Sequence, residues 1–151
     1  MANTYTQFIT QYVFAVKRRK KLITEEHREE LQKYMTGILR KYKHKVYAIY
    51  CMPDHTHIVV SPSPDMSPSE IMRLVKSNSS KMINENHWCK ERFEWQKGYG
   101  GFSYSQSHKD IVVKYVLNQK KHHERVNYEK EYRKFLDLFE IEYNEKYLFD
   151  E

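Results

Sequence analysis

Residues 45–61, KVYAIYCMPDHTHIVVS, contain two stretches of strand-forming residues joined by a proline-containing turn. Aromatic and β-branched residues dominate 45–52 and 55–61, which is typical of strands. Pro53 and Asp54 between them favour a tight turn. The stretch therefore predicts an antiparallel hairpin, and the rest of the fold can be worked out around it.

The second strand of this hairpin has two different faces. Because side chains alternate along a strand, His55, His57 and Val59 share one face. The β-carbons of His55 and His57 are then about 6.5–7 Å apart, so both imidazoles can reach one divalent cation. Two half-exposed histidines without a metal are the alternative interpretation. The opposite face is apolar enough to pack against helices: Thr56, Ile58 and Val60.

Helix and strand signals continue on both sides of the hairpin. Thr24 is expected to cap one helix, and Ser67 with Glu70 forms a capping box for another, with Pro68 at its first position. Ser107 is expected to cap a third helix. The expected elements are strands at 7–16 and 101–106 and helices at 24–43, 68–86, 108–124 and 128–141.

The resulting order is β-α-β-β-α-β followed by two more helices. This order predicts an α+β fold, a ferredoxin-like split βαβ antiparallel sheet with helices on one face, a tyrosine-bearing helix added after it and a final amphipathic helix. The sequence has no repeat or composition break, so we expect a single domain over 1–151.

Composition narrows the class of protein. The chain has 151 residues with a formal net charge of +6, which permits a polyanionic partner. Cys51 and Cys89 are isolated, which favours a reducing compartment, and no apolar run or leader pattern is visible. We expect a cytoplasmic protein that contacts no membrane. Phosphate-binding glycine motifs are absent, so no nucleotide cofactor is expected.

Two side chains after residue 110 could complete a site around the histidines. Tyr115 and Gln119 are four residues apart, one turn on the same face of the expected helix. The phenol could reach a reacting centre while the amide oxygen completes a metal site. Packing on an amphipathic helix is the alternative for Tyr115. His122 and His123 follow at the end of the helix and are interpreted as phosphate contacts.

Four blocks of the sequence together resemble a known family. These are MPDHTHIVV (52–60), SPSEIMRLVKSNSS (67–80), FEWQKGYGGFSYSQS (93–107) and YVLNQKKHH (115–123). In this order and spacing they resemble the single-tyrosine HUH transposases of the insertion sequence 200/605 type, including their relatives that act on repetitive palindromes. The middle residue of the HUH motif is usually bulky and hydrophobic, and here it is Thr56.

The resemblance implies a residue-level mechanism. His55 and His57 would bind a divalent cation, Mg²⁺ or Mn²⁺, with Gln119 as the third protein ligand. Tyr115 would be the nucleophile that forms a 5′-phosphotyrosine. The substrate would be single-stranded DNA with hairpins at the element ends in a bacterial or archaeal cell, and the enzyme would be a homodimer. The expected DNA contacts are Lys17, Arg18, Arg19, Lys20, Lys21, Lys76 and His122.

Two other functions fit parts of the pattern. A non-catalytic nucleic-acid-binding module of ferredoxin-like fold would expose aromatic side chains on an open sheet face. A hydrolase could use the HxH pair to hold zinc, but it would need a further acidic or histidine ligand on a strand, and no candidate has suitable spacing.

Overall fold

The computed structural model describes residues 3–149, so the ends of the expected domain, 1–2 and 150–151, lie outside the described residues. The elements follow the predicted order, except that the helix predicted over 108–124 is divided into shorter helices. They are β1 (Ile9–Ala15), η1 (Lys17–Arg19), α1 (Glu25–Lys41), β2 (Lys45–Cys51), β3 (His55–Ser61), α2 (Pro68–Glu85), β4 (Gly100–Tyr104), η2 (Gln106–His108), α3 (Lys109–Leu117), α4 (Gln119–His122) and α5 (Tyr128–Leu138).

The four strands form one antiparallel sheet in the order β2-β3-β1-β4. This is the ferredoxin-like arrangement, in which β3 and β1 are central and the two strands of the hairpin pair directly. The predicted α+β fold is therefore confirmed. Because β3 is central, the paired histidines lie in the middle of the sheet and not on an edge strand.

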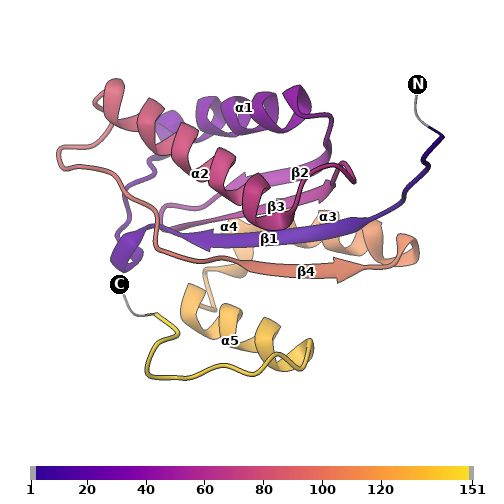
Figure 1. Ribbon diagram of the computed structural model, residues 1–151. Helices are drawn as coiled ribbons and strands as arrows, with labels where there is room; N and C mark the ends of the chain where they lie inside the picture. The colour runs from indigo at the N-terminus through magenta and orange to yellow at the C-terminus, as the bar shows by residue number, and fades with distance from the viewer. Residues whose placement is uncertain (1–2, 150–151) are drawn as a thin grey trace.

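Helices cover both faces of the sheet (Figure 1). α1 and α2 lie on one face, where they enclose the larger apolar core. α3, α4 and α5 lie on the other. The alternation predicted for β3 holds, because Ile58 and Val60 belong to the core under α1 and α2, whereas Val59 packs with Val112 and Val116 of α3.

Local capping explains where two of the helices begin. The Ser67 side chain accepts a hydrogen bond from the backbone N–H of Glu70, and Pro68 occupies the first turn of α2, as predicted. Thr24 precedes α1, as expected, but its side chain makes no capping hydrogen bond. No helix within the described residues is long and apolar enough to cross a membrane.

The tyrosine-bearing segment differs from the single helix predicted over 108–124. Ser107 lies in a 3-10 turn and His108 precedes α3, so the predicted Ser107 cap is wrong. At Asn118 the backbone leaves the helical region (φ −100°, ψ 20°), and α4 begins at Gln119. Asparagine competes with helical hydrogen bonding and favours such breaks. Tyr115 and Gln119 thus stand on two successive short helices.

Candidate active site

The two histidines of β3 are fully buried between the sheet and the C-terminal helices. Both His55 and His57 have 0% exposure, which excludes the half-exposed alternative. Their rings meet edge to face with centroids 5.1 Å apart. Burial lowers the pKa of His55, and its contact with Asp54 offsets part of that effect.

Each of these histidines is oriented by a neighbour on its Nδ1 side. His55 Nδ1 donates to Asp54 Oδ1 at 2.7 Å, and His57 Nδ1 lies 2.7 Å from Gln11 Oε1. Gln11 is itself fixed, because its Nε2 donates to the Tyr104 hydroxyl at 2.9 Å. Held in this way, both rings turn Nε2 toward α5. Metal-binding histidines in proteins commonly have their second nitrogen held by such a partner.

The Glu131 side chain of α5 reaches the centre of this site. Its Oε1 lies 3.0 Å from His57 Nε2, 3.1 Å from His123 Nε2 and 3.6 Å from His55 Nε2. Burial alone would raise the pKa of Glu131, but the surrounding imidazoles, His57 foremost, hold it well below its usual range. These four residues offer ligand atoms within 4.8 Å of one another, so they could hold a metal ion.

Tyr115 meets the same carboxylate from the side of α3. Its hydroxyl donates a hydrogen bond to Glu131 Oε2 and lies 3.2 Å from His122 Nε2. Its ring centroid is 6.0 Å from that of His57. Burial and the facing Glu131 carboxylate raise the pKa of Tyr115 well above its usual value. The phenol and the imidazoles therefore meet at one carboxylate within a single chain.

Gln119 is also buried beside this cluster. Its Nε2 donates to the backbone carbonyl of Tyr115 at 3.2 Å, whereas its Oε1 has no hydrogen-bond partner. His55 Nε2 is likewise buried without one. Buried polar atoms usually have partners. The unpaired His55 Nε2 lies among the ligand atoms of His57, His123 and Glu131, so this donor set fits a divalent cation.

Glu131 was not among the predicted site residues, and His123 was predicted only as a phosphate contact. Glu131 lies three residues after Tyr128 and four before Phe135, so it falls on the apolar face of the last amphipathic helix. A single carboxylate on an apolar helical face was the available signal. Its contact with His57 spans 74 residues of sequence, which helical periodicity cannot reveal.

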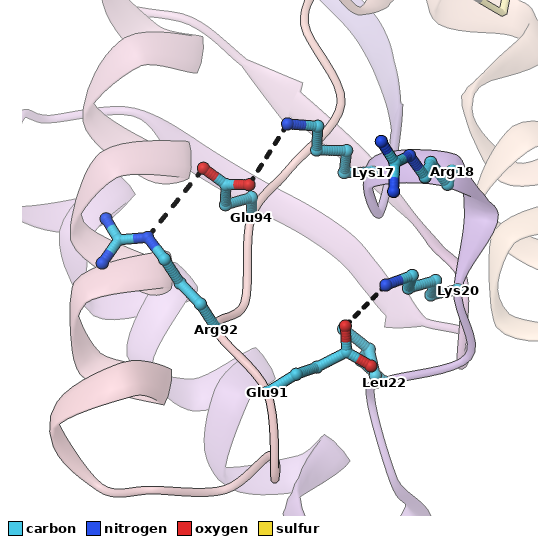
Figure 2. A pocket seen from close by; sticks show the side chains of 7 residues that line it. All are labelled: Lys17, Arg18, Lys20, Leu22, Glu91, Arg92 and Glu94. Carbon is cyan, nitrogen blue, oxygen red and sulfur yellow. Dashed lines mark hydrogen bonds and ion pairs between the residues drawn. The ribbon is translucent and has the colours of Figure 1, made fainter. Parts of the chain in front are cut away.

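Two of the predicted DNA-binding cations in the loop after β1 form ion pairs with glutamates at the protein surface. Figure 2 shows Lys17 beside Glu94 and Lys20 beside Glu91, at 3.3 and 2.6 Å, and Arg92 paired with Glu94. Arg18 and Lys21 are exposed in the same loop.

Two other predicted cations hold parts of the chain together. The Arg19 guanidinium donates to the backbone carbonyl of Phe149 and to Gln96. Lys76 Nζ donates to the carbonyls of Gln96 and Gly98 at 2.7 and 2.8 Å, so it fastens the loop before β4 to α2. Burial lowers the pKa of Lys76 to about 8.

Comparison with known proteins places this arrangement in a family. Two solved structures share the fold. One is from a Deinococcus radiodurans R1 protein classed as a transposase (TM-score 0.59, 19% identity, 79% of this chain and 96% of that one). The other is a REP-associated tyrosine transposase bound to a REP hairpin (TM-score 0.60, 17% identity, 83% of this chain and 76% of that one). No curated protein sequence matches at a significant level.

The family model described as "Transposase IS200 like" matches residues 4–119, which is most of the chain and includes His55, His57 and Tyr115. The chain therefore belongs to the IS200-like transposases, a family of DNA-processing enzymes.

Proposed function

We propose that this protein cuts and rejoins single-stranded DNA through Tyr115. The observation that carries the proposal is the convergence of the Tyr115 hydroxyl and His57 Nε2 on the Glu131 carboxylate. The phenol oxygen would attack the scissile phosphorus, forming an O–P bond while the bond from phosphorus to the 3′ oxygen breaks. The products are a 5′-phosphotyrosine and a free 3′-hydroxyl. Because the bond energy is conserved, the reverse step rejoins DNA without ATP.

The phenol proton must leave Tyr115 before or during attack. Since burial and the facing carboxylate raise its pKa, the free enzyme holds Tyr115 protonated at neutral pH. Glu131 already accepts the hydrogen bond from this phenol and orients it, while His122 Nε2, 3.2 Å from the same hydroxyl, is placed to take the proton as the O–P bond forms. A proton returned to the departing 3′ oxygen completes the balance.

His55, His57 and Gln119 would hold a divalent cation, Mg²⁺ or Mn²⁺. The unpaired Nε2 of His55, the unpaired Oε1 of Gln119 and the Nδ1 partners of both histidines support this ligand set. His123 and Glu131 offer further ligand atoms in the same place. A bound cation would polarise and orient the scissile phosphate. Mixed imidazole and oxygen donors suit Mn²⁺ well.

Hairpin-bearing single-stranded DNA is the proposed substrate. The net charge of +6 and the fold shared with a transposase bound to a REP hairpin support it. A homodimer remains part of the proposal. The Tyr115 ring lies 6.0 Å from that of His57 in the same chain, which supports a site assembled within one chain.

The alternative of a non-catalytic binding module has less support. Such a module would use an open sheet face carrying aromatic side chains. Here helices cover both faces of the sheet, and the central residues of β1 and β3 are buried. The buried histidines and the tyrosine beside them are better explained by chemistry.

The decisive experiment is covalent capture on DNA. Labelled hairpin-forming single strands from the DNA flanking the gene are incubated with the protein and Mn²⁺, then separated on a denaturing gel. We expect a protein-linked product with the wild type and none with Tyr115→Phe, while hairpin binding is largely retained. Tyr34→Phe on α1 is the matched control and should behave as wild type. Capture that survives in Tyr115→Phe would place the nucleophile elsewhere.

A further inference from the structure

Beside Tyr115, an apolar cavity opens between α3 and α5. It has a volume of about 250 Å³. Its walls include Val112, Tyr115, Val126 and Phe135. This volume lies just below the range of about 300–1,000 Å³ for small-molecule sites, so the cavity suits a single flat group and not a large ligand. Ile111 and Leu138 at its walls are 65% and 69% exposed, so apolar surface extends to solvent.

A second, open groove of about 530 Å³ continues from this cavity along α3 and α4. The two hollows share four lining residues, so they form one continuous surface: Ile111, Tyr115, His122 and Val126. The groove adds Lys114, Lys121 and Arg125, all exposed. No ion pair within residues 3–149 involves any of these three cations, in contrast to Lys17 and Lys20.

Few carboxylates line the cavity and the groove. Glu131 is the one carboxylate among the lining residues described, and it is engaged by Tyr115, His57 and His123 at the base of the cavity. Lys134 adds a further cation to the cavity lining. Apolar walls next to unpaired cations match a nucleotide, whose base is apolar on its faces and whose phosphate is anionic.

We propose that this surface binds the nucleotide next to the scissile phosphate, with the base in the apolar cavity and the flanking backbone along Lys114, Lys121 and Arg125. Tyr115 lines both parts, so seating the base would bring the adjacent phosphate to the nucleophile. This inference rests on the proposed DNA substrate. It adds that the protein itself binds one base of that DNA.

The first test removes the base from the DNA. Binding of hairpin single strands is measured by fluorescence anisotropy, with an abasic residue placed on either side of the cleavage position. One abasic position should weaken binding about 5–150-fold, the equivalent of stacking one base. The Ile111→Ala/Leu138→Ala variant should lose most of this preference. An abasic penalty that is equal in wild type and variant would overturn the base pocket.

The second test addresses the cations. Lys114→Ala/Lys121→Ala/Arg125→Ala should flatten the salt dependence of binding, by about 0.7 in log–log slope for each phosphate that the variant no longer neutralises. Lys81→Ala, an exposed cation on α2, is the control and should leave the slope unchanged. An unchanged slope in the triple variant would overturn the proposed backbone path.

These readouts separate this inference from the proposed function. Wild-type protein that binds no single-stranded DNA would remove both. Wild-type protein that binds and captures DNA, with groove variants identical to it, would remove only the nucleotide site. The exposed apolar walls could instead cover a second copy of the chain. Sedimentation that shows Ile111→Ala/Leu138→Ala dissociating a dimer, with DNA binding unchanged, would assign them to that contact and overturn the proposal.

Discussion

The two faces of the sheet differ in kind. Under α1 and α2 the strands present Tyr12, Phe14 and Ile58 to an apolar core. Under α3–α5 the neighbouring positions of the same strands present Gln11 and His57, which are just as deeply buried. The strands are shared, so strand-forming tendency cannot explain the difference. One face contributes burial of apolar surface, and the other accepts the cost of buried polar groups to hold a site.

This comparison predicts that substitutions on the two faces affect different measurements. The site face should control DNA chemistry with modest effects on folding. The α1/α2 face should control the free energy of unfolding with little effect on the chemistry of folded molecules.

The largest effect is expected at His57. His57→Ala should abolish metal-dependent cleavage, with a loss beyond the about 10–100-fold typical when an outer partner of a ligand is removed. Gln11→Leu, which removes only the acceptor on His57 Nδ1, should fall within that range. Cleavage rates are measured against Mn²⁺ concentration and with a chelator. Cleavage by His57→Ala in Mn²⁺ that equals wild type, or wild-type cleavage that a chelator leaves unchanged, would remove the histidines from metal binding.

The opposite result is expected at Leu31, which is fully buried in the core under α1. Leu31→Ala should lower the free energy of unfolding by about 2–5 kcal/mol, since it loses apolar burial and leaves a cavity. Urea unfolding measures the loss. Cleavage per folded molecule should match wild type. A cleavage defect of the His57→Ala size in folded Leu31→Ala would break the distinction between the two faces.

The sequence predicted more of the α1/α2 face than of the site face. Strand alternation and the capping box at Ser67 depend on neighbours in sequence, so β3 and α2 could be placed closely. The site combines contacts across 46 and 74 residues, from His57 to Gln11 and to Glu131. No local pattern encodes such pairings. The break at Asn118 was missed because no glycine or proline marks it.

Two adjacent glycines of β4 allow the packing on the two faces of the sheet to be compared directly. A β-carbon on Gly100 would meet ring atoms of Phe102 and Tyr132 at 2.9 Å, on the α5 side. A β-carbon on Gly101 would meet Tyr12 at 3.4 Å and Tyr99 at 3.8 Å, both ordinary van der Waals contacts, on the other side. Gly100→Ala should therefore cost about 1–3 kcal/mol through overpacking, and Gly101→Ala less than about 1 kcal/mol. Equal losses of unfolding free energy for the two variants, measured with urea, would show that α5 can shift to accommodate the added methyl group.

Lys76 gives a pH signature on the α2 side. Its folded pKa of about 8 lies below the ordinary 10.5, so the unfolded chain binds more protons between these values. The stability of wild type relative to Lys76→Met should therefore rise as pH increases from about 8 to 10.5. Raised tyrosine pKa values affect both proteins alike and cancel in the difference. A flat difference in unfolding free energy across this window would contradict the buried ammonium.

The smallest effect is expected at Gly37, on the exposed surface of α1, where an added β-carbon would meet no atom within 4 Å. Gly37→Ala should raise the free energy of unfolding by about 0.5–1 kcal/mol, because alanine loses less backbone entropy in a helix. The change is remote from the site face, so DNA capture by Tyr115 should be unaltered. A gain in stability accompanied by a change in capture rate would show that α1 communicates with the site through the sheet, and that the two faces are not independent.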